Sequence, residues 1–100
     1  IHLQRHLVEV GGASVTLTTQ EFAVLAYLLQ HYGEPVTRTD LIEAVWKYEE
    51  GVSDAAVNTC VARLRKKIEP DPAHPRYIHT HYDLGYRFEA QPQQPQAENR

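Results

Sequence analysis

The sequence has one cysteine, no methionine and no long apolar run. Cys60 cannot form a disulfide within the chain, so a reducing compartment such as the cytoplasm is expected. The longest nearly apolar stretch, residues 22–29, has eight residues, whereas a membrane-crossing helix needs about 20. Because the chain begins at Ile1 rather than at methionine, we expect a piece of a longer protein or a processed chain.

Basic residues are also few. The chain has 10 Lys and Arg against 13 Asp and Glu, and the net charge of −3 argues against a strongly basic nucleic-acid binder. The charges are unevenly distributed, however: residues 1–52 contain three cations and seven acids, whereas residues 53–87 contain six cations and four acids. Since the positive charge collects in one stretch, nucleic acid remains a candidate partner.

The length and composition predict a single globular domain. One hundred residues, of which 42% are hydrophobic, can form one modest core. We expect this domain to cover residues 1–90. Residues 91–100 contain no apolar side chain larger than that of Ala97, and their Gln and Pro content is typical of a disordered tail.

Short strands are predicted at both ends of the domain. Gly11 and Gly12 favour a hairpin turn between two runs of β-forming residues. A second hairpin is expected near the C-terminal end, with residues 83–85 at its tip. The predicted strands are residues 6–10, 14–18, 77–80 and 86–89.

Three helices are predicted between these hairpins, over residues 18–33, 38–46 and 54–69. Thr18 with Glu21 forms a capping box, and Thr37 and Ser53 are suitable N-caps for the second and third helices. Apolar residues spaced three and four apart predict the faces that pack in the core: Phe22, Leu25, Leu29, Tyr32, Leu41, Val45, Val57, Val61, Leu64 and Ile68. This element order is typical of an α+β winged helix-turn-helix, with short N-terminal antiparallel strands, a three-helix core and a C-terminal β-hairpin wing.

The third helix contains the strongest cationic feature. Its outward stripe is predicted to carry small and basic residues: Ala55, Ala56, Thr59, Ala62, Arg63 and Lys66. A helix of about 15 residues is about 22 Å long, and a helix with small side chains near its start fits a major groove about 12 Å wide. Arg63 can form two hydrogen bonds with guanine, and Thr59 can contact a base edge or a thymine methyl group. Arg65, Lys66 and Lys67 suit phosphates, although a solvated cationic face is an equally simple interpretation.

Separated motifs resemble one known family in order and spacing. The sequence is similar to the OmpR/PhoB-type winged helix, the DNA-binding output domain of bacterial two-component response regulators. The motifs that carry the resemblance are Leu17-Thr18-x-x-Glu21-Phe22-x-x-Leu25, Val36-Thr37-Arg38-x-x-Leu41-x-x-x-Val45-Trp46, Arg63-Leu64-Arg65-Lys66-Lys67-Ile68, Ile78-x-Thr80 and Gly85-Tyr86-Arg87-Phe88.

The resemblance implies roles for individual residues. Thr59 and Arg63 occupy the base-reading positions of the family. The residues at positions that contact the DNA backbone or support such a contact are Arg38, Trp46, Thr80 and Tyr86, and the wing includes His81 and Tyr82. The loop with Glu49, Glu50 and Gly51 matches the segment that touches RNA polymerase. The implied partners are double-stranded DNA with direct repeats, bound by a head-to-tail dimer, RNA polymerase, and a receiver or other input domain N-terminal to this chain.

The chain also departs from the family pattern. Ala55-Ala56 stands where the family usually has Arg-Thr, Cys60 where a histidine is common, and Tyr82 where an arginine enters the minor groove. Asp83 adds a negative charge to the wing. Ala55-Ala56, Asp83 and the net charge of −3 favour an alternative, a winged-helix protein-interaction module with weak or lost DNA binding.

Enzymatic and metal-dependent functions have little support in the sequence. No glycine-rich phosphate loop, nucleophile motif or suitably placed pair of carboxylates is present, so we expect neither an enzyme nor a cofactor. A redox or hydrolytic role for Cys60 competes with the more common case of a packed thiol. Zinc binding by His79 and His81, with His74 nearby, would lack the usual three or four ligands, so no metal site is expected.

Overall fold

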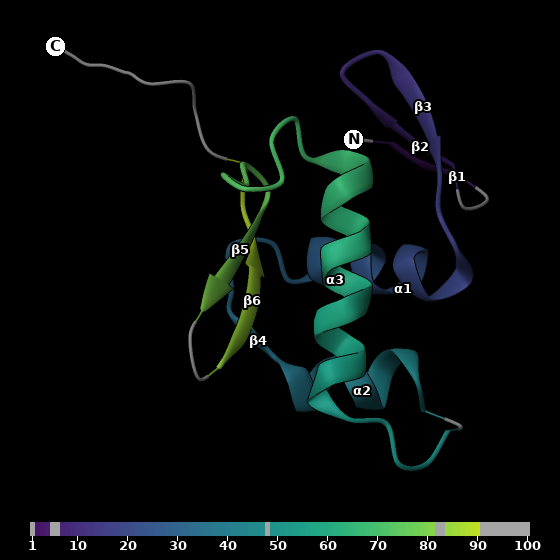
Figure 1. Ribbon diagram of the computed structural model, residues 1–100, viewed down its shortest axis with the longest axis vertical. Coiled ribbons are helices and arrows are strands. Elements are labelled where there is room, and N and C mark those ends of the chain that lie inside the picture. Colours follow the sequence, from purple (N-terminus) through teal and green to yellow (C-terminus); the bar gives the residue numbers. More distant parts are fainter. Residues whose placement is uncertain (1, 5–6, 48, 82–83, 91–100) are drawn as a thin grey trace, which may run out of the picture.

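The computed structural model describes residues 2–4, 7–47, 49–81 and 84–90 of the chain. In these residues, three helices lie between two three-stranded antiparallel sheets (Figure 1). The first sheet has the order β1-β2-β3, and the second has the order β4-β6-β5. The strands are β1 (His2–Gln4), β2 (Leu7–Val10), β3 (Ala13–Thr16), β4 (Val36–Thr37), β5 (Ile78–His81) and β6 (Gly85–Phe88). The winged helix-turn-helix is confirmed, but β1 and β4 were not predicted because runs of two or three residues have no recognisable periodicity.

The three helices begin at the expected caps. They are α1 (Thr19–Gln30), α2 (Arg38–Val45) and α3 (Asp54–Ile68). Thr18 Oγ1 accepts a hydrogen bond from the Glu21 backbone at 3.2 Å, and the Glu21 side chain accepts one from the Thr18 N–H at 2.9 Å. Thr37 and Asp40 repeat this reciprocal arrangement at the start of α2. Each cap satisfies amide groups that have no partner within the helix, so the local sequence determines where the helices start.

The core lies where α3 packs against α1 and α2. Val57, Val61 and Leu64 of α3 are fully buried, as are Leu25 of α1 and Leu41 of α2. Burying a side chain of this size stabilises the fold by about 1.5–3 kcal/mol. The inward face of α3 was therefore predicted correctly.

One predicted core residue, Tyr32, is wrong. Its side chain is 52% exposed, and the buried row of α1 passes instead through Glu21, Val24, Leu25 and Leu28. Because α1 ends before its C-cap at His31, the helical spacing no longer applies to Tyr32. Phe22, Leu29 and Val45, which were also predicted in the core, are partly buried and pack against it, as do Ile42 and Tyr77.

One turn and one close approach of two strands depend on glycine. Gly11 and Gly12 have φ angles of +57° and +85°, as a tight hairpin turn between β2 and β3 requires. Gly85 was expected at the wing tip but is the first residue of β6, where it pairs with Thr37 of β4. A Cβ atom at this position would lie 2.0 Å from the Val36 carbonyl oxygen, so only glycine permits this approach of the two strands.

A buried carboxylate attaches the second sheet to the end of α3. Glu69 is 6% exposed and follows the last residue of α3. Its two oxygens accept hydrogen bonds from the backbone N–H groups of Arg76, Tyr77 and Ile78, at 2.7–3.1 Å. These bonds determine where β5 begins relative to the C-terminal end of α3.

Some predictions fall on residues outside the described part of the chain. They are His6 in the first predicted strand, Tyr82 and Asp83 in the wing, and the tail of residues 91–100. Within the described residues, no helix combines the length and hydrophobicity that crossing a bilayer requires.

Candidate nucleic-acid interface

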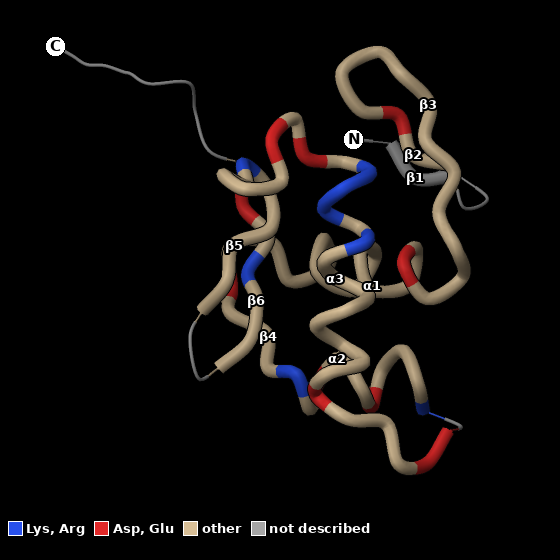
Figure 2. The backbone as a smooth tube through the Cα atoms, in the orientation of Figure 1, with Lys and Arg blue, Asp and Glu red and all other residues tan. Residues whose placement is uncertain are grey.

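The outward face of α3 is the candidate contact surface. Its members, Ala55, Ala56, Thr59, Ala62, Arg63 and Lys66, are all exposed. The cations lie in the C-terminal half of α3, whereas acidic residues lie in the loop before it and at its start (Figure 2). On the outward face, the N-terminal half of α3 therefore carries small side chains and no charge apart from Asp54, and the C-terminal half is basic.

An open hollow of about 360 Å³ lies beside this face. It is lined by residues of three segments: Thr18, Gln20, Glu21, Trp46, Ala56, Thr59, Cys60 and Arg63. Trp46 is the C-cap of α2 and is 8% exposed. The two expected base-reading residues, Thr59 and Arg63, are thus brought together with Trp46 around one surface depression.

Arg65 faces the wing instead of solvent. Its Nε and Nη2 donate hydrogen bonds to the Ile78 carbonyl at 3.2 and 2.9 Å, and Nη2 also donates to Thr80 Oγ1 at 2.7 Å. Burial lowers the pKa of Arg65, with Tyr86 and Glu69 acting in the opposite direction. Arg65 therefore fastens β5 to α3, and Thr80 is its partner.

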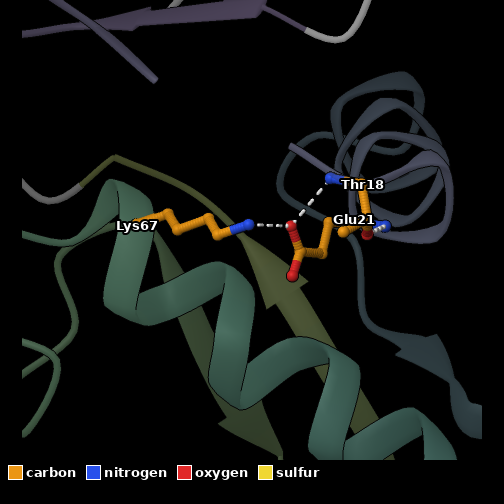
Figure 3. A network of polar contacts seen from close by, with 3 residues as sticks. All are labelled: Thr18, Glu21 and Lys67. Atoms are coloured by element: carbon orange, nitrogen blue, oxygen red, sulfur yellow. Dashed lines mark hydrogen bonds and ion pairs between the residues drawn. The ribbon is translucent and has the colours of Figure 1, made fainter. Parts of the chain in front are cut away.

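Lys67 fastens α3 to α1. Its Nζ lies 2.7 Å from Glu21 Oε1, which also accepts the Thr18 N–H (Figure 3). The Glu21 side chain is only 3% exposed. Burial by itself would raise the pKa of Glu21, but the hydrogen bonds and charge of Lys67, together with the Thr18 bonds, outweigh it and lower that pKa.

Arg63 and Lys66 behave differently from these two cations. Both side chains are exposed, and neither side chain forms a hydrogen bond or an ion pair with any residue that the structure describes. Their charges are therefore available to an external partner. Of the four basic residues at positions 63–67, Arg65 and Lys67 therefore form contacts within the domain, whereas Arg63 and Lys66 point to solvent.

Tyr86 lies between two guanidinium groups at the root of the wing. It is 4% exposed, and its ring centroid is 5.0 Å from Arg38 Cζ and 5.4 Å from Arg65 Cζ. Its hydroxyl donates to Asn58 Oδ1, which also accepts from Arg38 Nε at 2.8 Å. Sequence reasoning did not identify Asn58, because an exposed polar residue on a helix carries no signal for partners 20 and 28 positions away.

The expected wing and loop residues lie at two further edges. His81 is half-buried in β5 and pairs with Gly85, and Leu84 is 42% exposed, whereas Tyr82 lies outside the described residues. Glu49, Glu50 and Gly51 are exposed in the loop between α2 and α3. This loop is acidic, so it would repel a DNA phosphate and attract a basic protein surface.

The geometry does not favour the alternative chemistry of Cys60 and the histidines. Cys60 is 8% exposed, and burial, with a contribution from Glu21, raises the pKa of its thiol to about 11; a reactive thiol needs a lowered pKa. His79 Nε2 contacts the Glu89 carbonyl at 2.9 Å. In the described ranges, no three His, Cys, Asp or Glu side chains are grouped as metal ligands.

Comparison of the sequence with known proteins identifies relatives over most of the chain. The family model described as "Transcriptional regulatory protein, C terminal" matches residues 12–88. The sensory transduction protein RegX3 of Mycobacterium leprae is 40% identical over 88 residues, which cover 88% of this chain and 44% of that protein. RegX3 of Mycobacterium tuberculosis H37Rv is 40% identical over 87 residues, which cover 87% of this chain and 38% of that protein. The chain therefore spans less than half the length of these relatives.

Solved structures show the same fold. The response regulator DrrB of Thermotoga maritima, described as an OmpR/PhoB homolog, is 35% identical with a TM-score of 0.74, covering 85% of this chain and 45% of DrrB. The DNA-binding domain of Klebsiella pneumoniae RstA, solved in complex with the RstA box, is 31% identical with a TM-score of 0.72, covering 83% and 82% of the two chains. This chain belongs to the family of C-terminal domains of transcriptional regulatory proteins, the OmpR/PhoB-type winged helices.

Proposed function

We propose that the chain binds double-stranded DNA in a sequence-specific manner, with α3 in the major groove and the β5–β6 wing beside it. The observation that carries this proposal is the outward face of α3, where the exposed side chains of Thr59 and Arg63 adjoin small side chains and form no hydrogen bond with the described residues. The related RstA domain has been solved in complex with its DNA box, which supports DNA binding by this chain.

The proposed contacts fall into two classes. Arg63 and Thr59 read base edges, because they lie in the middle of the outward face. Lys66 and Trp46 contact phosphates on either side of them, and Arg38, Thr80 and Tyr86 serve the backbone at the root of the wing. His81 lies on the wing strand, and Tyr82 is assigned to the wing by its position in the sequence.

Arg65 and Lys67 also have donors left for phosphates. Arg65 uses Nε and Nη2 within the domain, which leaves Nη1. Lys67 uses Nζ for one hydrogen bond to Glu21, whereas an ammonium group has three protons to donate. Any phosphate contact from these residues is therefore made by a side chain that the fold already holds in place.

The role of the whole protein extends this proposal. Because the matching region covers less than half the length of these relatives, we assign this chain as the output domain of a cytoplasmic two-component regulator, controlled by a receiver or other input domain N-terminal to it. Two copies would bind direct repeats head to tail, one helical turn of DNA apart. Glu49, Glu50 and Gly51 would contact RNA polymerase.

Duplex selected from a random library, titrated at several salt concentrations, tests the proposal. Phosphate engagement predicts that the logarithm of the binding constant falls steeply with the logarithm of salt concentration. No binding, or binding without this dependence, would contradict it and favour the protein-interaction module.

Matched variants test the two classes of contact. Arg63→Ala is expected to weaken binding to the selected duplex by ~1–3 kcal/mol and to relax one base preference. Lys66→Ala should weaken all sequences alike and reduce the salt slope by about 1. Equal losses on random and selected DNA for Arg63→Ala would show that the base-reading position has been wrongly assigned.

A further inference from the structure

Asn58 joins three elements at the root of the wing. It lies on α3, and its single amide oxygen accepts hydrogen bonds from Arg38 Nε of α2 and from the Tyr86 hydroxyl of β6. A guanidinium N–H can only donate, so the oxygen of the amide must face Arg38. The orientation of the Asn58 side chain therefore follows from the chemistry of its partners.

Arg38 is held on two sides as a result. Its Nε donates to Asn58 at 2.8 Å, and its Cζ lies 5.0 Å from the centroid of the Tyr86 ring. Its terminal nitrogens, Nη1 and Nη2, form no hydrogen bond with residues in the described part of the chain. An arginine held through Nε and beside an aromatic ring presents its terminal donors in the single plane of the guanidinium, as a phosphate oxygen pair requires.

We propose that Asn58 is a positioning residue for DNA binding, which orients Arg38 toward a backbone phosphate without itself reading a base. This inference rests on the proposed function. A free arginine loses much side-chain entropy when it binds, and an arginine already held in place loses less. Asn58 thus increases affinity through Arg38, and it increases it for all DNA sequences alike.

The test is a double-mutant cycle measured by titration of the selected duplex at one salt concentration. We expect Asn58→Ala to weaken binding about three- to tenfold and Arg38→Ala to weaken it at least as much. In the Arg38→Ala background, Asn58→Ala should have no further effect, because the residue it positions is gone. Lys66→Ala is the matched control, and its effect should be the same in both backgrounds.

Arg38→Lys provides a second measurement that does not depend on how well Asn58→Ala folds. Lysine keeps the positive charge but has a single nitrogen, so it lacks the rigid planar fork that donates to Asn58 from one nitrogen and presents coplanar donors on two others. We expect Arg38→Lys to lose about as much affinity as Asn58→Ala, and wild-type affinity for this variant would overturn the inference.

The remaining outcomes separate the two proposals. If the wild-type chain binds DNA and Asn58→Ala costs the same in both backgrounds, Asn58 acts independently of Arg38 and the positioning role is overturned. If the wild-type chain binds no duplex, the proposed function fails, and the positioning role fails with it.

Discussion

Arg63 and Arg65 are two positions apart on α3 and have opposite environments. Two residues correspond to a rotation of about 200° around a helix. Arg63 is therefore exposed on the outward face, while Arg65 is half-buried against the wing and donates three hydrogen bonds. The same residue type therefore provides a solvent-exposed charge at position 63 and hydrogen bonds within the domain at position 65.

Lys66 and Lys67 repeat this contrast. Lys66 is exposed and has no ion pair with a described residue, whereas Lys67 binds the buried carboxylate of Glu21. Counting the basic residues in the sequence therefore overestimates the number of positive charges that are available to a binding partner. In this domain, Arg65 and Lys67 hold α3 against β5 and α1, whereas Arg63 and Lys66 lie on the outward face of the same helix.

The largest expected effect that tests this contrast is on stability at position 65. Arg65→Met should lower the free energy of unfolding by about 2–4 kcal/mol, because it removes charge-assisted hydrogen bonds to Ile78 and Thr80. Arg63→Met is the control and should change it by no more than about 0.5 kcal/mol. Urea denaturation measures both. Equal destabilisation by the two variants would contradict the structural role of the Arg65 hydrogen bonds.

A smaller effect, with a pH signature, is expected at position 67. Because the pKa of Glu21 in the folded state lies below its ordinary value of 4.5, its ionised form stabilises the fold above that pH. This contribution is lost as the pH falls through the folded pKa.

Lys67→Met should reduce this stabilisation by about 1–2 kcal/mol at pH 7, since Lys67 is partly exposed and solvent screens the pair. Burial then dominates, the pKa of Glu21 rises, and the loss of stability below pH 4.5 becomes shallower than in the wild type. Urea denaturation across a pH series measures both effects, with Lys66→Met as the control. If the free energy of unfolding falls below pH 4.5 as steeply in Lys67→Met as in the wild type, the ion pair between Lys67 and Glu21 does not contribute to the pH dependence of stability.

A further test of the two faces of α3, which does not bear on its cations directly, concerns Cys60 at the boundary between them. Burial raises the pKa of its thiol from 9.0 to about 11, so ionisation alone should slow its reaction with a disulfide reagent about a hundredfold relative to the unfolded chain. The reaction rate at pH 7.5, with and without urea, measures this. A rate in the folded protein equal to that of the unfolded chain would indicate an activated thiol in the hollow beside Arg63.

Local features of the chain predicted most of the fold. The capping pairs Thr18–Glu21 and Thr37–Asp40 are three residues apart, so their hydrogen bonds require no tertiary contact. The inward row of α3 followed from its spacing in the same way. Tyr32 was misplaced because periodicity does not show where a helix ends, and β4 was missed because its two residues become a strand only by pairing with β6.

The sequence by itself determined the helices, their caps and the basic character of one face, because the capping hydrogen bonds and the helical spacing involve residues only three or four positions apart. Only the tertiary structure decided which cations are free and which residue orients Arg38. Lys67 and Glu21 are 46 positions apart, and Asn58 lies 20 and 28 positions from its two partners. Contacts over such separations depend on how whole elements pack, and no local pattern records them.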